Sequence, residues 1–173
     1  MLILDTRHGA VLADPLLQWL PARDLSLPIF ALTYAPILWG IVIVVREGAQ
    51  VLAVIYSYAL LQIMRLTTIF MLPLEPPELM VLLSDPIADH LVFGTRVTKD
   101  LFFSGHVSAI MLFSFFIQNR RWRWLFRWVA LADAVCLLVQ HVHYSIDVFA
   151  APMFALTAYS VVRVLMTPKP STF

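Results

Sequence analysis

The sequence contains little cysteine and little charge, and both shortages restrict the class of protein. Cys136 is the only cysteine among 173 residues, so no disulfide can form within the chain. Charged residues make up 13% of the chain and hydrophobic residues 61%, whereas soluble domains have about 25% and about 45–50%. These values argue against an ordinary soluble domain and indicate an integral membrane protein.

Other features are missing as well. The formal net charge is only +1, and no basic face suggests nucleic acid as a partner. The N-terminus carries Asp5 and Asp14 but no basic region and no small-residue cleavage site, so we expect no signal peptide. No internal repeat is visible. We therefore expect one all-α domain, a polytopic membrane helical bundle that meets lipids.

Long apolar runs with few charges predict about five transmembrane helices, at 25–45, about 49–72, 101–117, about 124–141 and about 148–166. Charges and prolines interrupt residues 1–24, which are expected to lie on the membrane as an interfacial segment. The expected organisation is the segment 1–24, a single domain 25–166 and a loose tail 167–173.

The third and fourth spans form a hairpin around the basic-aromatic patch 119–127, which we interpret as a turn. Fifteen residues separate Gly105 from Arg120, and 16 separate Arg127 from His143. Each arm therefore travels roughly 22–24 Å, which returns His143 to the membrane face that His106 left. Because short basic loops tend to stay in the cytoplasm, both histidines are expected on the non-cytoplasmic face.

The first candidate motif is Ser104-Gly105-His106, at the start of the third span. Serine is a favoured N-cap, glycine lets a ligand approach the backbone, and free N–H groups at a helix start suit a phosphate. Histidine can give or take a proton near neutral pH. The alternative interpretation is an ordinary capped helix with an interfacial histidine.

The second candidate motif is His143-Tyr144-Ser-Ile-Asp147. The i,i+4 spacing places the imidazole and the carboxylate on one helix face, so Asp147 can hold one ring nitrogen and present the other as a nucleophile. The alternative is a polar pair at a helix end. Ionisable residues at membrane depth are functional by default, and two such motifs at one face favour the functional interpretation.

Other polar residues in the spans leave alternatives open. Arg65 can snorkel to the membrane surface, or face inward and bind a phosphate or Asp147. His141 is expected to be interfacial, although a metal site with His106 and His143 is a weaker alternative. Asp133 is expected to face the bundle and accept hydrogen bonds. We expect no metal and no cofactor.

These motifs resemble those of the type-2 phosphatidic acid phosphatase superfamily, and most closely its sphingomyelin synthase branch. Each of the four motif regions of that branch has a counterpart here, at 14–21, 65–73, 100–106 and 143–147. The phosphatase branch has an arginine six residues before its second histidine, where this chain has Leu137. The absence of that arginine fits a singly charged phosphodiester. In the third region, Thr98-Lys99-Asp100 stands where the synthase branch has Cys-Gly-Asp.

The resemblance implies a membrane phosphotransferase that moves a phospho-head group from a glycerophospholipid to a lipid hydroxyl, such as that of ceramide. It implies catalytic roles for His106, His143 and Asp147, with a phosphohistidine intermediate. Substrate-binding residues would be Arg65, Ser104, Gly105 and Tyr144. The alternatives are a lipid phosphatase or phospholipase C-like hydrolase that uses water as the acceptor, and a non-enzymatic protein that binds lipid.

Overall fold

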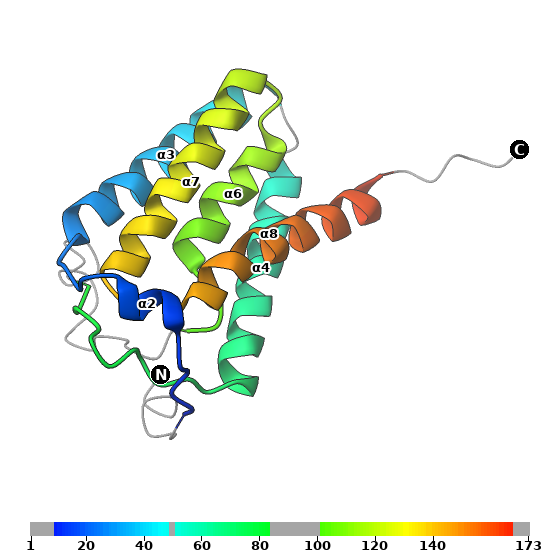
Figure 1. The fold of residues 1–173 in the computed structure, drawn as a ribbon. Coiled ribbons are helices and arrows are strands. Elements are labelled where there is room, and N and C mark those ends of the chain that lie inside the picture. The colour runs from blue at the N-terminus through cyan, green and yellow to red at the C-terminus, as the bar shows by residue number, and fades with distance from the viewer. Residues whose placement is uncertain (1–8, 49–50, 84–100, 168–173) are drawn as a thin grey trace, which may run out of the picture.

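The structure is a computed structural model that describes residues 9–48, 51–83 and 101–167. Within these ranges it has six helices, and the only strand-like pairing is an isolated bridge between Ala10 and Leu74. In chain order the helices are α2 (Pro15–Trp19), α3 (Ser26–Arg46), α4 (Val51–Met71), α6 (Gly105–Phe116), α7 (Arg120–Val139) and α8 (Ser145–Met166) (Figure 1). The all-α prediction is confirmed. Residues 84–100, between the second and third expected spans, and most of the expected tail lie outside the described residues.

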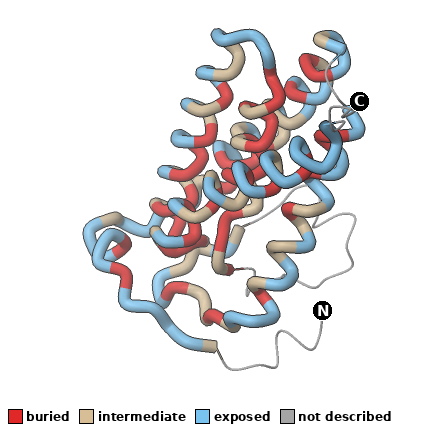
Figure 2. Tube along the Cα trace, turned by 90° about the vertical axis from the view of Figure 1, so that its right-hand side faces the viewer, coloured by how far each residue is buried: buried red, intermediate tan, exposed pale blue. Residues whose placement is uncertain are grey.

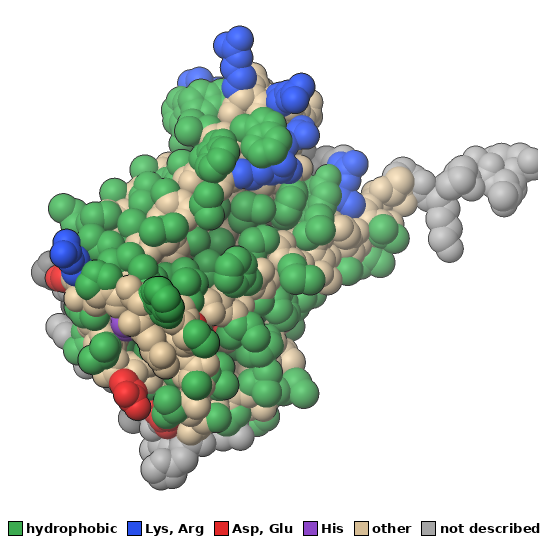
Figure 3. Space-filling view, viewed as in Figure 1, with side chains coloured by type: hydrophobic (Ala, Val, Ile, Leu, Met, Phe, Trp, Pro, Cys, Tyr) green, Lys and Arg blue, Asp and Glu red, His purple; other side chains and the backbone are tan. Residues whose placement is uncertain are grey.

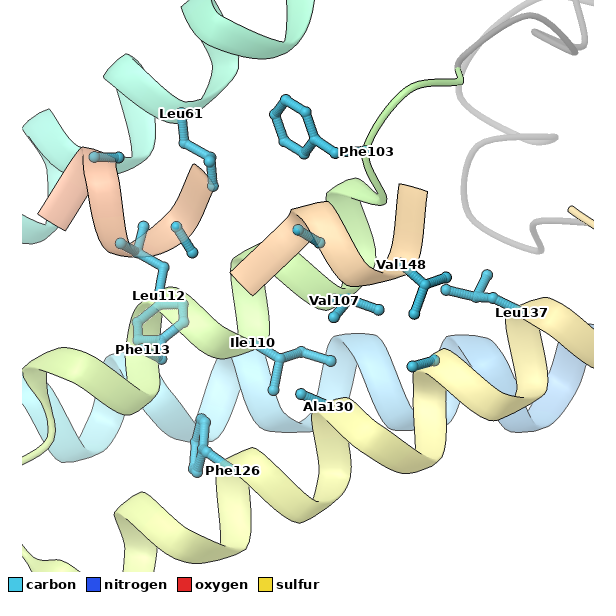
Figure 4. Close-up of a cluster of buried hydrophobic side chains, with 14 of the residues drawn as sticks. Leu61, Phe103, Val107, Ile110, Leu112, Phe113, Phe126, Ala130, Leu137 and Val148 are labelled. Carbon is cyan, nitrogen blue, oxygen red and sulfur yellow. The ribbon is translucent and has the colours of Figure 1, made fainter. Parts of the chain in front are cut away.

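α6 lies at the centre of the bundle. It packs against α7, α8, α3 and α4, while α3 also packs on α7 and α4 on α8. Buried side chains such as Ile110, Leu112 and Phe126 fill the interior (Figure 4). Gly40 allows α3 to approach closely, because a Cβ atom at this position would lie 2.7 Å from the Phe113 ring.

Three helices, α3, α4 and α8, are long and apolar enough to cross a membrane. Their inner faces are buried while their outer faces remain exposed (Figure 2). The exposed faces are apolar: Leu38, Phe149 and Val164 are 65%, 70% and 75% exposed. Such extensive exposed apolar surface is suited to lipid rather than water. The prediction of a helical membrane bundle is therefore confirmed.

The third predicted span is shorter in the structure than in the prediction. The helix was expected from Leu101, but α6 begins at Gly105 and has 12 residues, which is about 18 Å of helix. Leu101, Phe103 and Ser104 precede it in non-helical conformation and are buried. Non-helical backbone at membrane depth is tolerated where protein covers it. The central position of α6 therefore explains its short length.

The basic-aromatic patch is helical, so its interpretation as a turn is wrong. The turn is confined to 117–119, and α7 begins at Arg120, where the side chain of Asn119 accepts a hydrogen bond from Arg121 N. Arginine is a good helix former, and an N-cap suffices to start the helix within the patch. Because of its arginines and Asp133, α7 does not meet the composition expected of a spanning helix, despite its 20 residues.

Most of the Lys and Arg side chains visible in Figure 3 lie at one end of the bundle, whereas the visible Asp and Glu side chains lie toward the other end. One end, called the arginine end, comprises the end of α3, the 117–119 turn and the start of α7; there the Glu47 carboxylate accepts hydrogen bonds from Gln118 N and Asn119 N. The opposite end, called the histidine end, holds the starts of α6 and α8. The short helix α2 lies across the histidine end (Figure 1), and the interfacial position expected for residues 1–24 stays a prediction.

Candidate active site

The start of α6 is fixed by its cap and by the residues that lead into it. The Ser104 hydroxyl accepts a hydrogen bond from Val107 N at 3.4 Å, which confirms the expected N-cap. Just before it, Phe102 has a φ of 111°, a conformation that non-glycine residues rarely adopt. Phe103 stacks on Phe154 of α8 with ring centroids 4.3 Å apart. Such strain persists only where packing enforces it, and it is often found at functional sites.

The start of α8 carries the second motif as a buried pair. His143 Nδ1 lies 3.2 Å from Asp147 Oδ2, and the same oxygen accepts a hydrogen bond from Tyr144 N at 3.1 Å. His143 is 3% exposed and Asp147 is fully buried. A carboxylate on Nδ1 favours the tautomer with its proton there. The Nε2 lone pair is then left to act as a base or nucleophile.

The two motifs lie side by side. Ser104 N donates a hydrogen bond to the Asp147 carbonyl oxygen at 3.2 Å, which joins the start of α6 to the first turn of α8. His106 follows in the first turn of α6, with its ring 6.4 Å from that of Phe30 on α3 in an edge-on arrangement. The structure thus places both histidines at the same end of the bundle, as the matched hairpin arms predict.

Arg65 faces inward, toward the first of these motifs. Its guanidinium lies directly against Gly105, in the space that a Cβ atom would occupy there. Of the two alternatives left open by the sequence, the inward position is therefore the one observed, and phosphate binding by Arg65 stays a prediction. The glycine at the helix start is what allows a cation to lie beside the free N–H groups of α6.

Tyr144 has a structural role that the sequence did not suggest. The side chain is 1% exposed, and its hydroxyl donates to the Glu75 carbonyl oxygen at 2.9 Å and accepts from Leu12 N at 3.3 Å. It thereby connects three separate segments beneath the site. The substrate-binding roles expected for Tyr144, Ser104 and Gly105 stay predictions.

Asp14 supports the second motif from the N-terminal segment. Its carboxylate caps α2 through Leu16 N and also accepts a hydrogen bond from Ser145 N, at 2.6 Å. Burial alone would raise the pKa of Asp14, but the hydrogen bonds, above all those from Ser145, outweigh it and lower the pKa below its usual value. The Asp-Pro start of α2 gave a local signal for the cap, whereas the contact with Ser145 has no signal in the sequence.

Gln140 and His141 hold the turn between α7 and α8. Gln140 is fully buried; its Oε1 accepts from Leu25 N at 2.8 Å and its Nε2 donates to Ser26 Oγ at 2.9 Å. His141 has a φ of 56°, and its Nε2 lies 3.1 Å from the Leu20 carbonyl oxygen. His141 is buried within the protein, and its expected position at the membrane interface stays a prediction. Among the described residues no group of histidine, cysteine and carboxylate side chains is arranged to hold a metal.

Comparison with known families agrees with the location of this site. Residues 99–164 match the family described as PAP2 superfamily C-terminal, a range that contains both histidine motifs. Searches of curated proteins and of solved structures gave no match. Proteins of the PAP2 superfamily are generally phosphatases or phosphotransferases, so the match supports an enzyme of that type, without distinguishing the branch. Residues 99–164 are therefore similar to the C-terminal part of the PAP2 superfamily, and this similarity covers both histidine motifs.

Proposed function

We propose that the chain is a sphingomyelin synthase-like phosphotransferase, which moves a phospho-head group from a glycerophospholipid to a lipid hydroxyl such as that of ceramide. The observation that carries the proposal is the buried His143–Asp147 pair, hydrogen-bonded through the backbone to the start of α6. Leu137 supports a diester substrate, because it is fully buried in the core at the position where the phosphatase branch has an arginine. We place the site on the non-cytoplasmic face.

In the first half-reaction, His143 Nε2 attacks phosphorus and the bond from phosphorus to the diacylglycerol oxygen breaks. His106 gives its proton to that oxygen, and Asp147 stabilises the positive charge on the phosphorylated imidazole. In the second half-reaction, His106 takes the proton of the incoming hydroxyl, whose oxygen displaces His143 from phosphorus. Both histidines return to their starting states, and the scheme needs no cofactor.

Arg65 and the N–H groups at the start of α6 are the groups proposed to stabilise the phosphoryl oxygens. A guanidinium held against Gly105 adds a full charge to the partial positive charge of the helix start. Fixed charges of this kind, placed where negative charge develops, are often the largest contribution to catalysis.

Lipid turnover by the purified protein tests this function. The protein in liposomes is incubated with phosphatidylcholine or phosphatidylethanolamine, with and without ceramide, and products are read by mass spectrometry. Diacylglycerol together with a ceramide phosphodiester supports the transferase. Diacylglycerol with free head-group phosphate, regardless of ceramide, would instead identify a hydrolase of the same chemistry. Unchanged turnover in a His143→Ala variant would contradict the mechanism.

Gly105→Ala is expected to lower turnover by about tenfold or more with little loss of stability. The added methyl group displaces the Arg65 guanidinium. The long Arg65 side chain is flexible enough for its guanidinium to move without unfolding the helix. The measurement is turnover and melting temperature in a double-mutant cycle with Arg65→Ala. In the Arg65→Ala background, Gly105→Ala should cost no further activity; an equal loss in both backgrounds would contradict the role of Arg65.

A further inference from the structure

Asp133 is a buried carboxylate that the mechanism above does not use. It lies in the middle of α7, is fully buried, and neither of its oxygens has a hydrogen-bond partner among the described residues. The Thr33 hydroxyl of α3 lies close to the carboxylate, without a hydrogen bond of ordinary geometry. Such a buried carboxyl group is costly to ionise unless something compensates its charge.

The register of α6 against α7 places Asp133 opposite His106. At the arginine end, Arg123 Nε donates to the Ile117 carbonyl oxygen at 3.1 Å. One turn further, the Phe113 and Phe126 rings both lie against Gly40. Another turn on, Ile110 and Ala130 face each other (Figure 4). The helices run antiparallel, so the next turn of each brings His106 level with Asp133.

The contacts of α3 agree with this register. Phe30 contacts the His106 ring, and Thr33 faces the Asp133 carboxylate. Phe30 and Thr33 are three residues apart, which places them on neighbouring positions of one helix face. His106 and Asp133 therefore face the same turn of α3 from two different helices.

We propose that Asp133 is a positioning residue, whose carboxylate stabilises the protonated imidazole of His106 and keeps it ready to donate its proton. The inference rests on the acid role of His106 in the proposed function. In a buried setting of low permittivity, a negative charge acts strongly on a histidine several ångströms away. Among the described residues, the other charged groups near the start of α6 are Arg65 from α4, which opposes protonation of His106, and the His143–Asp147 pair from α8. The described part of α3 carries no charged residue near Phe30.

The test is the titration of His106 in Asp133→Asn, followed by NMR of protein labelled at histidine and assigned with a His106→Gln variant. Removal of the carboxylate charge is expected to make His106 lose its proton about one pH unit lower. Thr33→Val, which alters the same contact without changing charge, should leave the titration unchanged. Should Asp133→Asn not fold, Asp133→Leu, of similar shape and without polar atoms, replaces it.

This readout requires no substrate, so it separates the inference from the proposed function. An unchanged His106 titration in a folded variant overturns the role of Asp133, even if the transferase is active. A shifted titration in a chain without lipid turnover overturns the function and leaves the coupling intact. In an active chain, kcat at neutral pH is expected to fall about tenfold with unchanged KM, and a melting-temperature loss alone would contradict the proposal.

Discussion

Replacing His143 with glutamine is expected to lower lipid turnover by about 10⁴-fold or more, because the nucleophile is lost and with it the covalent route. The wild-type protein should form a phosphorylated species when given the donor lipid alone, and the variant should form none. Rapid quenching followed by intact-mass measurement detects it. Because a phosphohistidine is labile in acid, the quench must be neutral or alkaline.

His141 provides a matched control for His143. It is also a buried histidine, two residues away, but its ring contacts the Leu20 carbonyl oxygen rather than a carboxylate of the site. His141→Gln is expected to keep the phosphorylated species and most of the turnover. If both variants lost turnover equally while folded, the assignment of His143 as the nucleophile would fail.

Asp147→Asn is the second change with a large expected effect, on the order of 10²–10⁴ in kcat. Asparagine fits the same space and can still accept a hydrogen bond from Tyr144 N, so the start of α8 is kept. What it lacks is the negative charge that opposes the charge of the phosphorylated imidazole. The expected result is a slower appearance of the phosphorylated species, measured by rapid quench, with little change in melting temperature.

Asp14→Asn is the control for Asp147, since Asp14 is a carboxylate that also contacts the start of α8, through Ser145 N. This variant should lose stability, by about 1 kcal/mol, because the charge-assisted hydrogen bond from Ser145 N becomes a neutral one, and should keep a near-normal rate of phosphorylation. The opposite pattern, a rate loss in Asp14→Asn and none in Asp147→Asn, would contradict the assignment of Asp147 as the carboxylate that supports His143.

Long apolar runs made α3, α4 and α8 predictable, with ends within a few residues of those expected. The apolar run alone put the start of α6 at Leu101, because such a run does not distinguish buried helix from buried extended chain. The cap at Ser104 decides the boundary. The start of α7 was missed for the opposite reason: charge suggested a loop, although arginine favours a helix.

The candidate site was predictable to the extent that it is local. The pairing of His143 with Asp147 follows from i,i+4 spacing, and the shared end of the two motifs follows from the lengths of the hairpin arms. The contact of Asp14 with Ser145 and the position of Arg65 against Gly105 join residues far apart in the chain. No periodicity reports such contacts, so they required the structure.

Because α6 begins only at Gly105, its first turn, which carries His106, lies alongside α3 rather than beyond the end of that helix. Since His106 meets α3 at Phe30, four residues after the start of that helix at Ser26, it lies level with a point about 6 Å along α3 from its first residue. A lipid whose phosphate reacts there can keep its acyl chains in the same leaflet throughout. For the proposed function, a reacting centre at this depth along α3 would favour a membrane-borne hydroxyl over bulk water as the second substrate.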